Sequence, residues 1–153
     1  MNIFILDKDK NKNAEYHCDK HVVKMITEYN QLLCSAYYFT DNVSDGIYKL
    51  THQNHPCAKW TRESLSNWIW LRDMNLILCK EYTFRYNKTH KGEILCKSLI
   101  LPDIKDKGLT EFAQVLPDEY KSDDVVEAYR KYYNVEKRHV FSWRNRNIPE
   151  WIK

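Results

Sequence analysis

The chain has 153 residues, with 24 Lys and Arg against 21 Asp and Glu, so its formal net charge is only +3. An excess of this size is common on ordinary protein surfaces and does not by itself indicate a polyanionic partner. Apolar residues make up 43% of the chain and aromatic residues 14%, which excludes disorder over most of its length. We therefore expect one domain over residues 1–153.

The five cysteines show no short-range disulfide framework, and no basic and then apolar leader follows Met1. The longest apolar stretches, residues 3–6 and 98–101, fall far short of the roughly 20 residues that cross a bilayer. These features predict reduced thiols, a cytoplasmic location and no membrane partner.

The first half of the chain contains two long stretches with helical periodicity. Residues 2–6 form a short apolar, β-prone run, which predicts either a single strand or an extended arm packed on helices. Apolar residues at helical spacing then predict a helix over residues 13–39. Residues 41–46 are expected to form a loop. Because Pro56 suits a first helical turn, a second helix is predicted over residues 55–86.

The second half is less regular and ends in a basic, aromatic tail. A short helix is predicted over residues 90–100, followed by a long loop over 103–121 with a helical turn near 111–115. Ser122 is a candidate N-cap for a last helix, whose apolar face includes Tyr129 and Tyr133. The overall expectation is an all-α, mainly helical, compact single domain with a short N-terminal extended segment.

A polar stripe on the first long helix is the most informative pattern. His17, His21, Lys24, Glu28 and Gln31 recur at steps of four, three, four and three residues, which places them on one helical face. In a cleft, Glu28 could move protons beside the Lys24 amine and the imidazole of His21. On a solvated face, the same residues would be ordinary neighbouring partners.

Three polar residues, His52, Asn54 and His55, lie just before and at the start of the second predicted helix. A helix start offers free backbone N–H groups that favour phosphate or carboxylate, although Asn54 or His55 could equally serve as a simple cap. A structural zinc is a weaker alternative, because its ligands would have to come from two distant segments. Those ligands would be His17, Cys18, His21, His55 and Cys57.

Cations in the second half of the chain are interleaved with flat aromatic rings. Arg144 and Arg146 lie near Phe141, Trp143 and Trp151, and Arg62 and other arginines precede them. Arginine can neutralise phosphates while a ring stacks on a base, so this composition is compatible with nucleic-acid binding. The same rings could instead fill the core.

Three short segments resemble the phage endonuclease V type of pyrimidine-dimer DNA glycosylase. They are Asp19-Lys-His21 with Glu28 seven residues later, Asn54-His55-Pro56, and Tyr132-Tyr133 with Pro149-x-Trp151. Over its whole length, the chain is more similar to uncharacterised proteins of phages and large DNA viruses. The resemblance to the glycosylases implies an all-α fold, base excision through an imine, strand cleavage by β-elimination and no metal.

Within that resemblance, Glu28 corresponds to the catalytic carboxylate and His21 to a DNA-contacting histidine. The family's nucleophile is an α-amine, so the amine of Met1 or that of Lys24 would act here, or the lyase chemistry is lost. Thr27 and Gln31 stand where the family has arginines.

The leading hypothesis is a DNA-processing protein, a possible DNA glycosylase with AP lyase activity on damaged or modified bases, in the host cytoplasm if viral. The alternative is a catalytically silent viral module that sequesters a nucleotide or blocks a host protein. We expect no metal and no cofactor. The predicted catalytic residues are Glu28, Lys24 and His21, and the predicted substrate contacts are His17, Gln31, His52, Asn54, His55, Arg62, Arg144 and Arg146.

Overall fold

The computed structural model describes residues 1–153 as six α-helices and three short 3-10 helices without a strand, which confirms the all-α prediction. No helix combines the length and apolar character needed to span a membrane. The α-helices are α1 Lys10–Tyr16, α2 Asp19–Ala36, α3 Pro56–Glu63, α4 Leu65–Tyr86, α5 Lys91–Ser98 and α6 Val125–Glu136. The 3-10 helices are η1 Tyr37–Phe39, η2 Asp118–Tyr120 and η3 Arg138–Val140.

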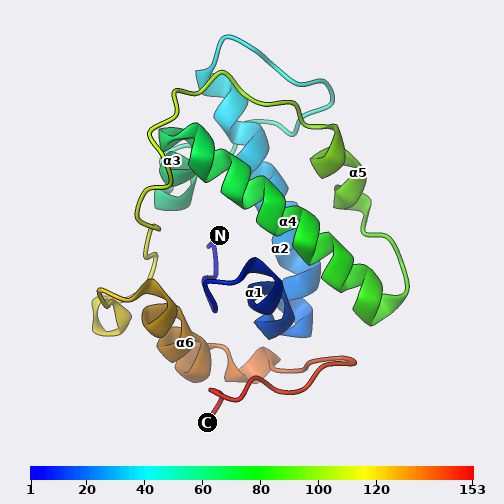
Figure 1. The fold of residues 1–153 in the computed structure, drawn as a ribbon, viewed down its shortest axis with the longest axis vertical. Helices are drawn as coiled ribbons and strands as arrows, with labels where there is room; N and C mark the ends of the chain where they lie inside the picture. The colour runs from blue at the N-terminus through cyan, green and yellow to red at the C-terminus, as the bar shows by residue number, and fades with distance from the viewer.

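Helices α2 and α4 form the centre of the molecule, where they pack side by side and run in opposite directions (Figure 1). The short helix α5 packs against both of them, while α6 and the C-terminal tail lie across one end. One cluster of 31 buried apolar residues takes in the N-terminal segment and side chains from all six helices. All five cysteines are free and buried, as expected from their spacing.

The N-terminal segment 1–6 is an extended arm in the middle of the molecule, which agrees with the second of the two predicted alternatives (Figure 1). Residues 3–6 are buried, yet no strand pairs with them. Side chains satisfy their backbone instead: Asn13 Oδ1 accepts from Leu6 N (2.7 Å), and Asn13 Nδ2 donates to Phe4 O (3.1 Å). A buried backbone needs such partners, so Asn13 fixes the path of the arm.

The prediction of one continuous helix over residues 13–39 is wrong. The helix is interrupted at His17 and Cys18, which separate α1 from α2. The buried guanidinium of Arg85 donates to the carbonyl oxygens of Glu15 and His17, both at 2.8 Å. Tyr133 accepts from the backbone N–H of Cys18 at 3.0 Å. These distant side chains supply the partners that a continuous helix would have supplied.

The second predicted helix, over residues 55–86, is likewise divided, with a break at Ser64 between α3 and α4. Ser64 has an extended backbone (φ −148°, ψ 144°), and its hydroxyl donates to the Asp106 carboxylate at 3.0 Å. Asp106 also accepts from the backbone N–H of Ser66 at 3.0 Å, so a carboxylate from a distant loop caps the start of α4.

Two smaller predictions in the second half also need correction. Residues 111–115 are not helical, because Tyr129 of α6 occupies their backbone groups, donating to Ala113 O (2.9 Å) and accepting from Val115 N (3.3 Å). Asp124, rather than Ser122, caps α6 by accepting from Val126 N at 2.9 Å. The short helix predicted over residues 90–100 is present as α5.

Candidate functional site

The polar stripe of α2 borders a small open hollow of about 130 Å³. The N-terminal arm forms one wall of the hollow, and the end of α6 forms another. The hollow therefore brings together segments from both ends of the chain. Its lining residues are Met1, Asn2, Phe4, His21, Lys24, Met25, Glu28, Tyr132 and Lys137.

Glu28 lies between two amines in this hollow. Its Oε1 is 3.2 Å from Nζ of Lys24, and its Oε2 is 3.9 Å from the α-amine of Met1. The Glu28 side chain is 14% exposed, whereas that of Lys24 is 61% exposed. One carboxylate within reach of two primary amines is an arrangement that can accept a proton from an attacking amine.

His21 is held rigidly at the edge of the hollow and stays neutral near pH 7. Its ring stacks on Phe4 with centroids 4.6 Å apart, and its Nδ1 lies 2.7 Å from the hydroxyl of Tyr133. Burial lowers the pKa of His21 to about 3, and the positive charges of Lys137, Lys24 and Lys20 add to the effect. The Tyr133 hydroxyl already accepts a hydrogen bond from Cys18 N, so we assign it as the donor to Nδ1 of His21. The neutral imidazole of His21 then carries its own proton on Nε2.

His55 lies beside Met1, although it does not line the hollow. Its Nδ1 accepts from Cys57 N at 3.1 Å and caps α3, as one of the two sequence interpretations expected. Burial and the charge of the Met1 α-amine lower the pKa of His55, and the ring also interacts with the Met1 backbone. The start of α3 therefore adjoins the same amine that faces Glu28.

The break before α2 changes the membership of the polar stripe. His17 has no exposed surface, and its Nδ1 lies 2.6 Å from Asn13 O in the core. Burial lowers the pKa of His17 to about 4, so it is a neutral core residue, and we withdraw it from the predicted substrate contacts. Gln31 is partly exposed on α2 but does not line the hollow.

His52 and Asn54 are both exposed in the turn that precedes α3. The backbone of His52 is left-handed (φ 49°), and its Nδ1 lies 2.6 Å from the Thr51 hydroxyl. Neither residue lines the hollow. Their predicted role as substrate contacts therefore stays a prediction.

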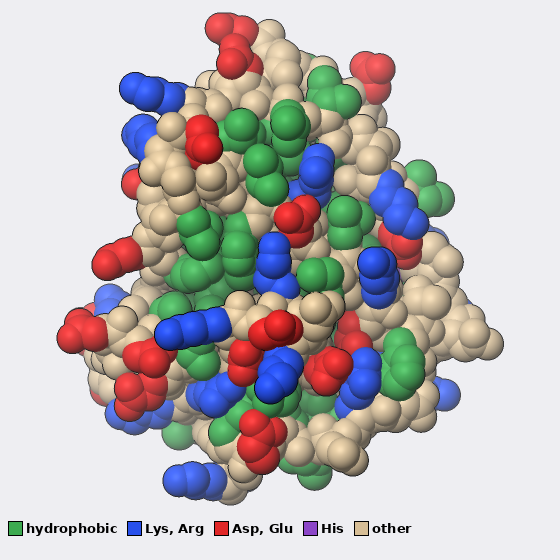
Figure 2. Space-filling view, viewed as in Figure 1, with side chains coloured by type: hydrophobic (Ala, Val, Ile, Leu, Met, Phe, Trp, Pro, Cys, Tyr) green, Lys and Arg blue, Asp and Glu red, His purple; other side chains and the backbone are tan.

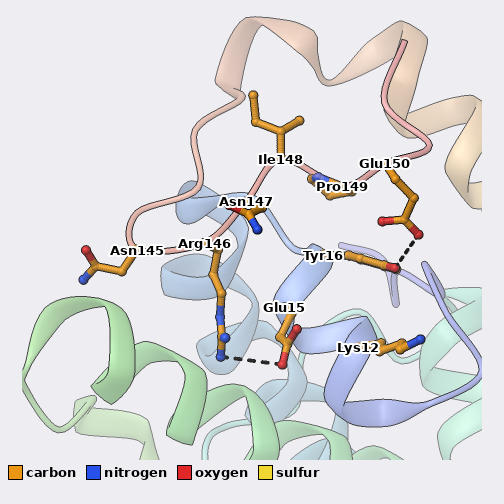
Figure 3. Close-up of a pocket in the computed structure, with 9 residues that line it drawn as sticks. All are labelled: Lys12, Glu15, Tyr16, Asn145, Arg146, Asn147, Ile148, Pro149 and Glu150. Atoms are coloured by element: carbon orange, nitrogen blue, oxygen red, sulfur yellow. Dashed lines mark hydrogen bonds and ion pairs between the residues drawn. The ribbon is translucent and has the colours of Figure 1, made fainter.

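The tail arginines are engaged with the protein itself. Arg146 is paired with Glu81 at 2.9 Å and with Glu15 at 3.6 Å, at the edge of a separate polar pocket (Figure 3). Arg144 is exposed, and its backbone N–H donates to the Asp19 carboxylate at 2.9 Å. Two carboxylates already neutralise Arg146, so a DNA phosphate would have to compete with them.

Arg62 lies at the end of α3, away from the hollow, with its guanidinium carbon 4.1 Å from the centroid of the Phe39 ring. The face of the molecule seen in Figure 2 mixes Lys and Arg with Asp and Glu and shows no continuous basic surface. On this face, nucleic acid would therefore have to be held by a few local cations.

Sequence patterns alone missed part of this hollow. Phe4 was visible only as part of an apolar run, and Tyr132 and Tyr133 only as part of a helix face and of the third segment of resemblance. No signal in the sequence connects Lys137 with α2. No group of three or more His, Cys, Asp or Glu side chains is gathered to hold a metal ion, so the five residues of the zinc alternative are not assembled.

Comparison with family models, with curated proteins and with solved structures found no match to this chain. The assignment of a function therefore depends on the geometry of the site and on the three short segments of resemblance.

Proposed function

We propose that this protein processes DNA as a glycosylase with AP lyase activity, and that the hollow at Glu28 is its active site. The single observation that carries the proposal is the placement of Glu28 between the amines of Met1 and Lys24, at 3.9 and 3.2 Å. Lys137 also lines the hollow, so cations outnumber the one carboxylate, which suits an anionic substrate.

The chemistry begins when an unprotonated amine attacks C1′ of the target sugar. A C–N bond forms, the glycosidic bond breaks, and the base leaves with its electron pair. Glu28 receives the proton of the amine and returns it to O4′ as the C1′–O4′ bond opens, which leaves a protonated imine. Glu28, again a carboxylate, then takes a proton from C2′, the C2′–C3′ double bond forms, and the 3′ phosphate leaves with the electron pair of the C3′–O bond.

Neutral His21 would position the substrate rather than transfer protons. With its Nδ1 engaged by Tyr133, the ring offers Nε2–H as a hydrogen-bond donor. A neutral donor can bind a sugar or phosphate oxygen without titrating between pH 5 and 8. This role is consistent with the DNA-contacting histidine that the resemblance implies.

Borohydride trapping tests this proposal directly. The protein is incubated with a duplex that contains an abasic site or a pyrimidine dimer, reduced, and analysed by mass mapping. We expect a covalent adduct on the Met1 α-amine or on Lys24. Intact mass before reaction establishes whether Met1 is the first residue of the protein used.

The matched variants are Glu28→Gln and Glu111→Gln, since Glu111 is exposed and lies outside the hollow. Glu28→Gln should lower base release by about 10²- to 10⁴-fold while DNA binding is retained. Glu111→Gln should behave as the parent protein. A fully active Glu28→Gln protein, or no adduct with either duplex, would refute the proposal.

A catalytically silent binding module is the second candidate. The observation that favours its host-protein form is the volume of about 130 Å³, below the roughly 300 Å³ at which small-molecule pockets begin, which disfavours a nucleotide inside this hollow. Tight binding of a nucleotide or host protein without turnover of any DNA would support this alternative.

A further inference from the structure

A second hollow, of about 340 Å³, lies at the other end of α2 from the break at His17 and shares no residue with the first. The segment from α5 to α6 passes over this end of α2 and beside α3 (Figure 1). Three cations line the hollow: Arg62 from α3, and Lys105 and Lys107 from the passing segment.

Arg62 forms no ion pair within the chain. Its Nη1 is buried without a hydrogen-bond partner, and Arg62 takes part in none of the ion pairs of the structure, whereas Arg85 and Arg146 pair with carboxylates. Burial lowers the pKa of Arg62, and the carboxylates of Glu63 and Asp103, which also line the hollow, form no ion pair with it. A partly buried cation without an anion is unfavourable unless a ligand supplies one.

The Phe39 ring orients this guanidinium. The Arg62 carbon lies 4.1 Å from the ring centroid, and Phe39 itself is 49% exposed. Stacking on an aromatic face limits the rotation of the planar fork, which lowers the entropy lost when the fork binds an anion.

Lys105 and Lys107 are held by an anchored backbone. Between them, Asp106 turns towards α4 and accepts from Ser66 Oγ (2.6 Å) and Ser64 Oγ (3.0 Å). These hydrogen bonds lower the pKa of Asp106 to about 2, so it stays ionised. Ser64 Oγ also accepts from Lys107 N at 2.9 Å. The carboxylate is thus used internally, while both lysines are exposed and form no ion pair.

We propose that this second hollow binds a phosphate ester, with Arg62 as an oriented two-donor fork and with Lys105 and Lys107 as point charges. Guanidinium matches the oxygens of a phosphate in two-point fashion, and lysine adds charge with little directional demand. The phosphate would come from a nucleic-acid backbone or from a free nucleotide. A backbone source rests on the proposed function, whereas the site itself does not.

The test compares two double variants with the same change in charge. Lys105→Gln/Lys107→Gln alters the hollow, and Lys88→Gln/Lys91→Gln alters two exposed lysines elsewhere that form no ion pair. The probes are inorganic phosphate, a deoxynucleoside monophosphate and a single-stranded oligonucleotide of about 20 nucleotides. Arg62→Gln is a third variant that removes the fork alone.

If the source is a backbone, the oligonucleotide binds and its affinity falls about tenfold at physiological salt in the Lys105→Gln/Lys107→Gln variant. The dependence of log K on log salt should also become shallower by about 1.4, because each lost contact to a single strand contributes about 0.7. If the source is a free nucleotide, the monophosphate binds instead and is weakened by Arg62→Gln. Either result supports the site.

Equal losses in the two double variants, or no binding of any of the three probes by the parent protein, would overturn the inference. The outcome is separate from that of the trapping experiment. Phosphate binding without a covalent adduct would refute the proposed lyase activity and support the phosphate site. An adduct together with unchanged binding in all three variants would support the lyase activity and refute the phosphate site.

Discussion

Two regions of this protein concentrate charge, and they use it in opposite ways. Around Arg85, near the tail, each buried charge has a partner: Arg85 pairs with Glu81 at 2.8 Å and with Asp19 at 3.0 Å, and Arg146 closes on Glu81 at 2.9 Å. In the hollow at Glu28, one carboxylate faces two amines, and the side chain of Lys24 is 61% exposed. We call the first the closed region, because its buried charges are all paired, and such pairing indicates a structural role. In the hollow, the cations outnumber the carboxylate, so an anionic substrate can still be bound there.

The largest expected effect is a loss of stability when an ion pair of the closed region is removed. Arg85→Met should lower the free energy of unfolding by about 3 to 5 kcal/mol, because it leaves the carbonyls of Glu15 and His17 and part of the Glu81 charge without partners. Urea unfolding followed by circular dichroism measures it. Arg144→Met, at an exposed arginine, is the control and should change stability by less than about 0.5 kcal/mol. Equal losses in the two variants would contradict a structural role specific to Arg85.

The second prediction concerns the pH dependence of stability, which differs between the buried histidines and Glu81 of the closed region. Burial lowers the pKa of His21 to about 3 and that of His17 to about 4, from an ordinary value of 6.5. Below pH 6.5 the unfolded chain therefore binds protons that the folded chain does not, so the free energy of unfolding decreases as the pH is lowered. The loss between pH 6.5 and 5 should be about 2 to 4 kcal/mol for the two rings together.

Glu81 responds in a lower pH window. Burial alone would raise its pKa, but hydrogen bonds from Arg146 and Arg85 outweigh burial and hold the pKa below its ordinary value of 4.5. The stabilisation that Glu81 provides is therefore complete above about pH 4.5 and is lost on further acidification. Urea midpoints from pH 7 down to about pH 3, with NMR of the histidine rings, check both windows. Rings that titrate near pH 6.5 with flat stability would contradict the assignment of His17 and His21.

Helical periodicity predicts most of the core but not the interruptions of the helices. Val22, Met25 and Tyr29 lie at the spacing that predicts one apolar face of a helix over residues 13–39, and all three are buried. The break at His17 depends on Arg85, 68 residues away, and the break at Ser64 on Asp106, 42 residues away. Local sequence carries no record of such long-range partners, so both pairs of helices were predicted as single helices.

The candidate site divides in the same way. His21, Lys24 and Glu28 follow from positions on one helix, and the structure places them around one hollow. The Met1 amine that faces Glu28 and the Tyr133 hydroxyl that holds His21 come from distant segments of the chain. Only the tertiary fold, in which the arm and α6 both pack on α2, brings these groups together.

The smallest expected effect is the loss of stability when the carboxylate of the hollow, Glu28, is neutralised. Glu28→Gln should change the free energy of unfolding by less than about 1 kcal/mol, since its ion pair involves the exposed Lys24 and a separation of 3.9 Å from the Met1 amine. Glu81→Gln, the matched change in the closed region, should cost more because Arg85 and Arg146 both donate to that buried carboxylate. Urea unfolding of the two variants at pH 7 gives the difference directly. A larger loss at Glu28 than at Glu81 would mean that the hollow, too, is a structural ion cluster, and the argument for an active site there would fail.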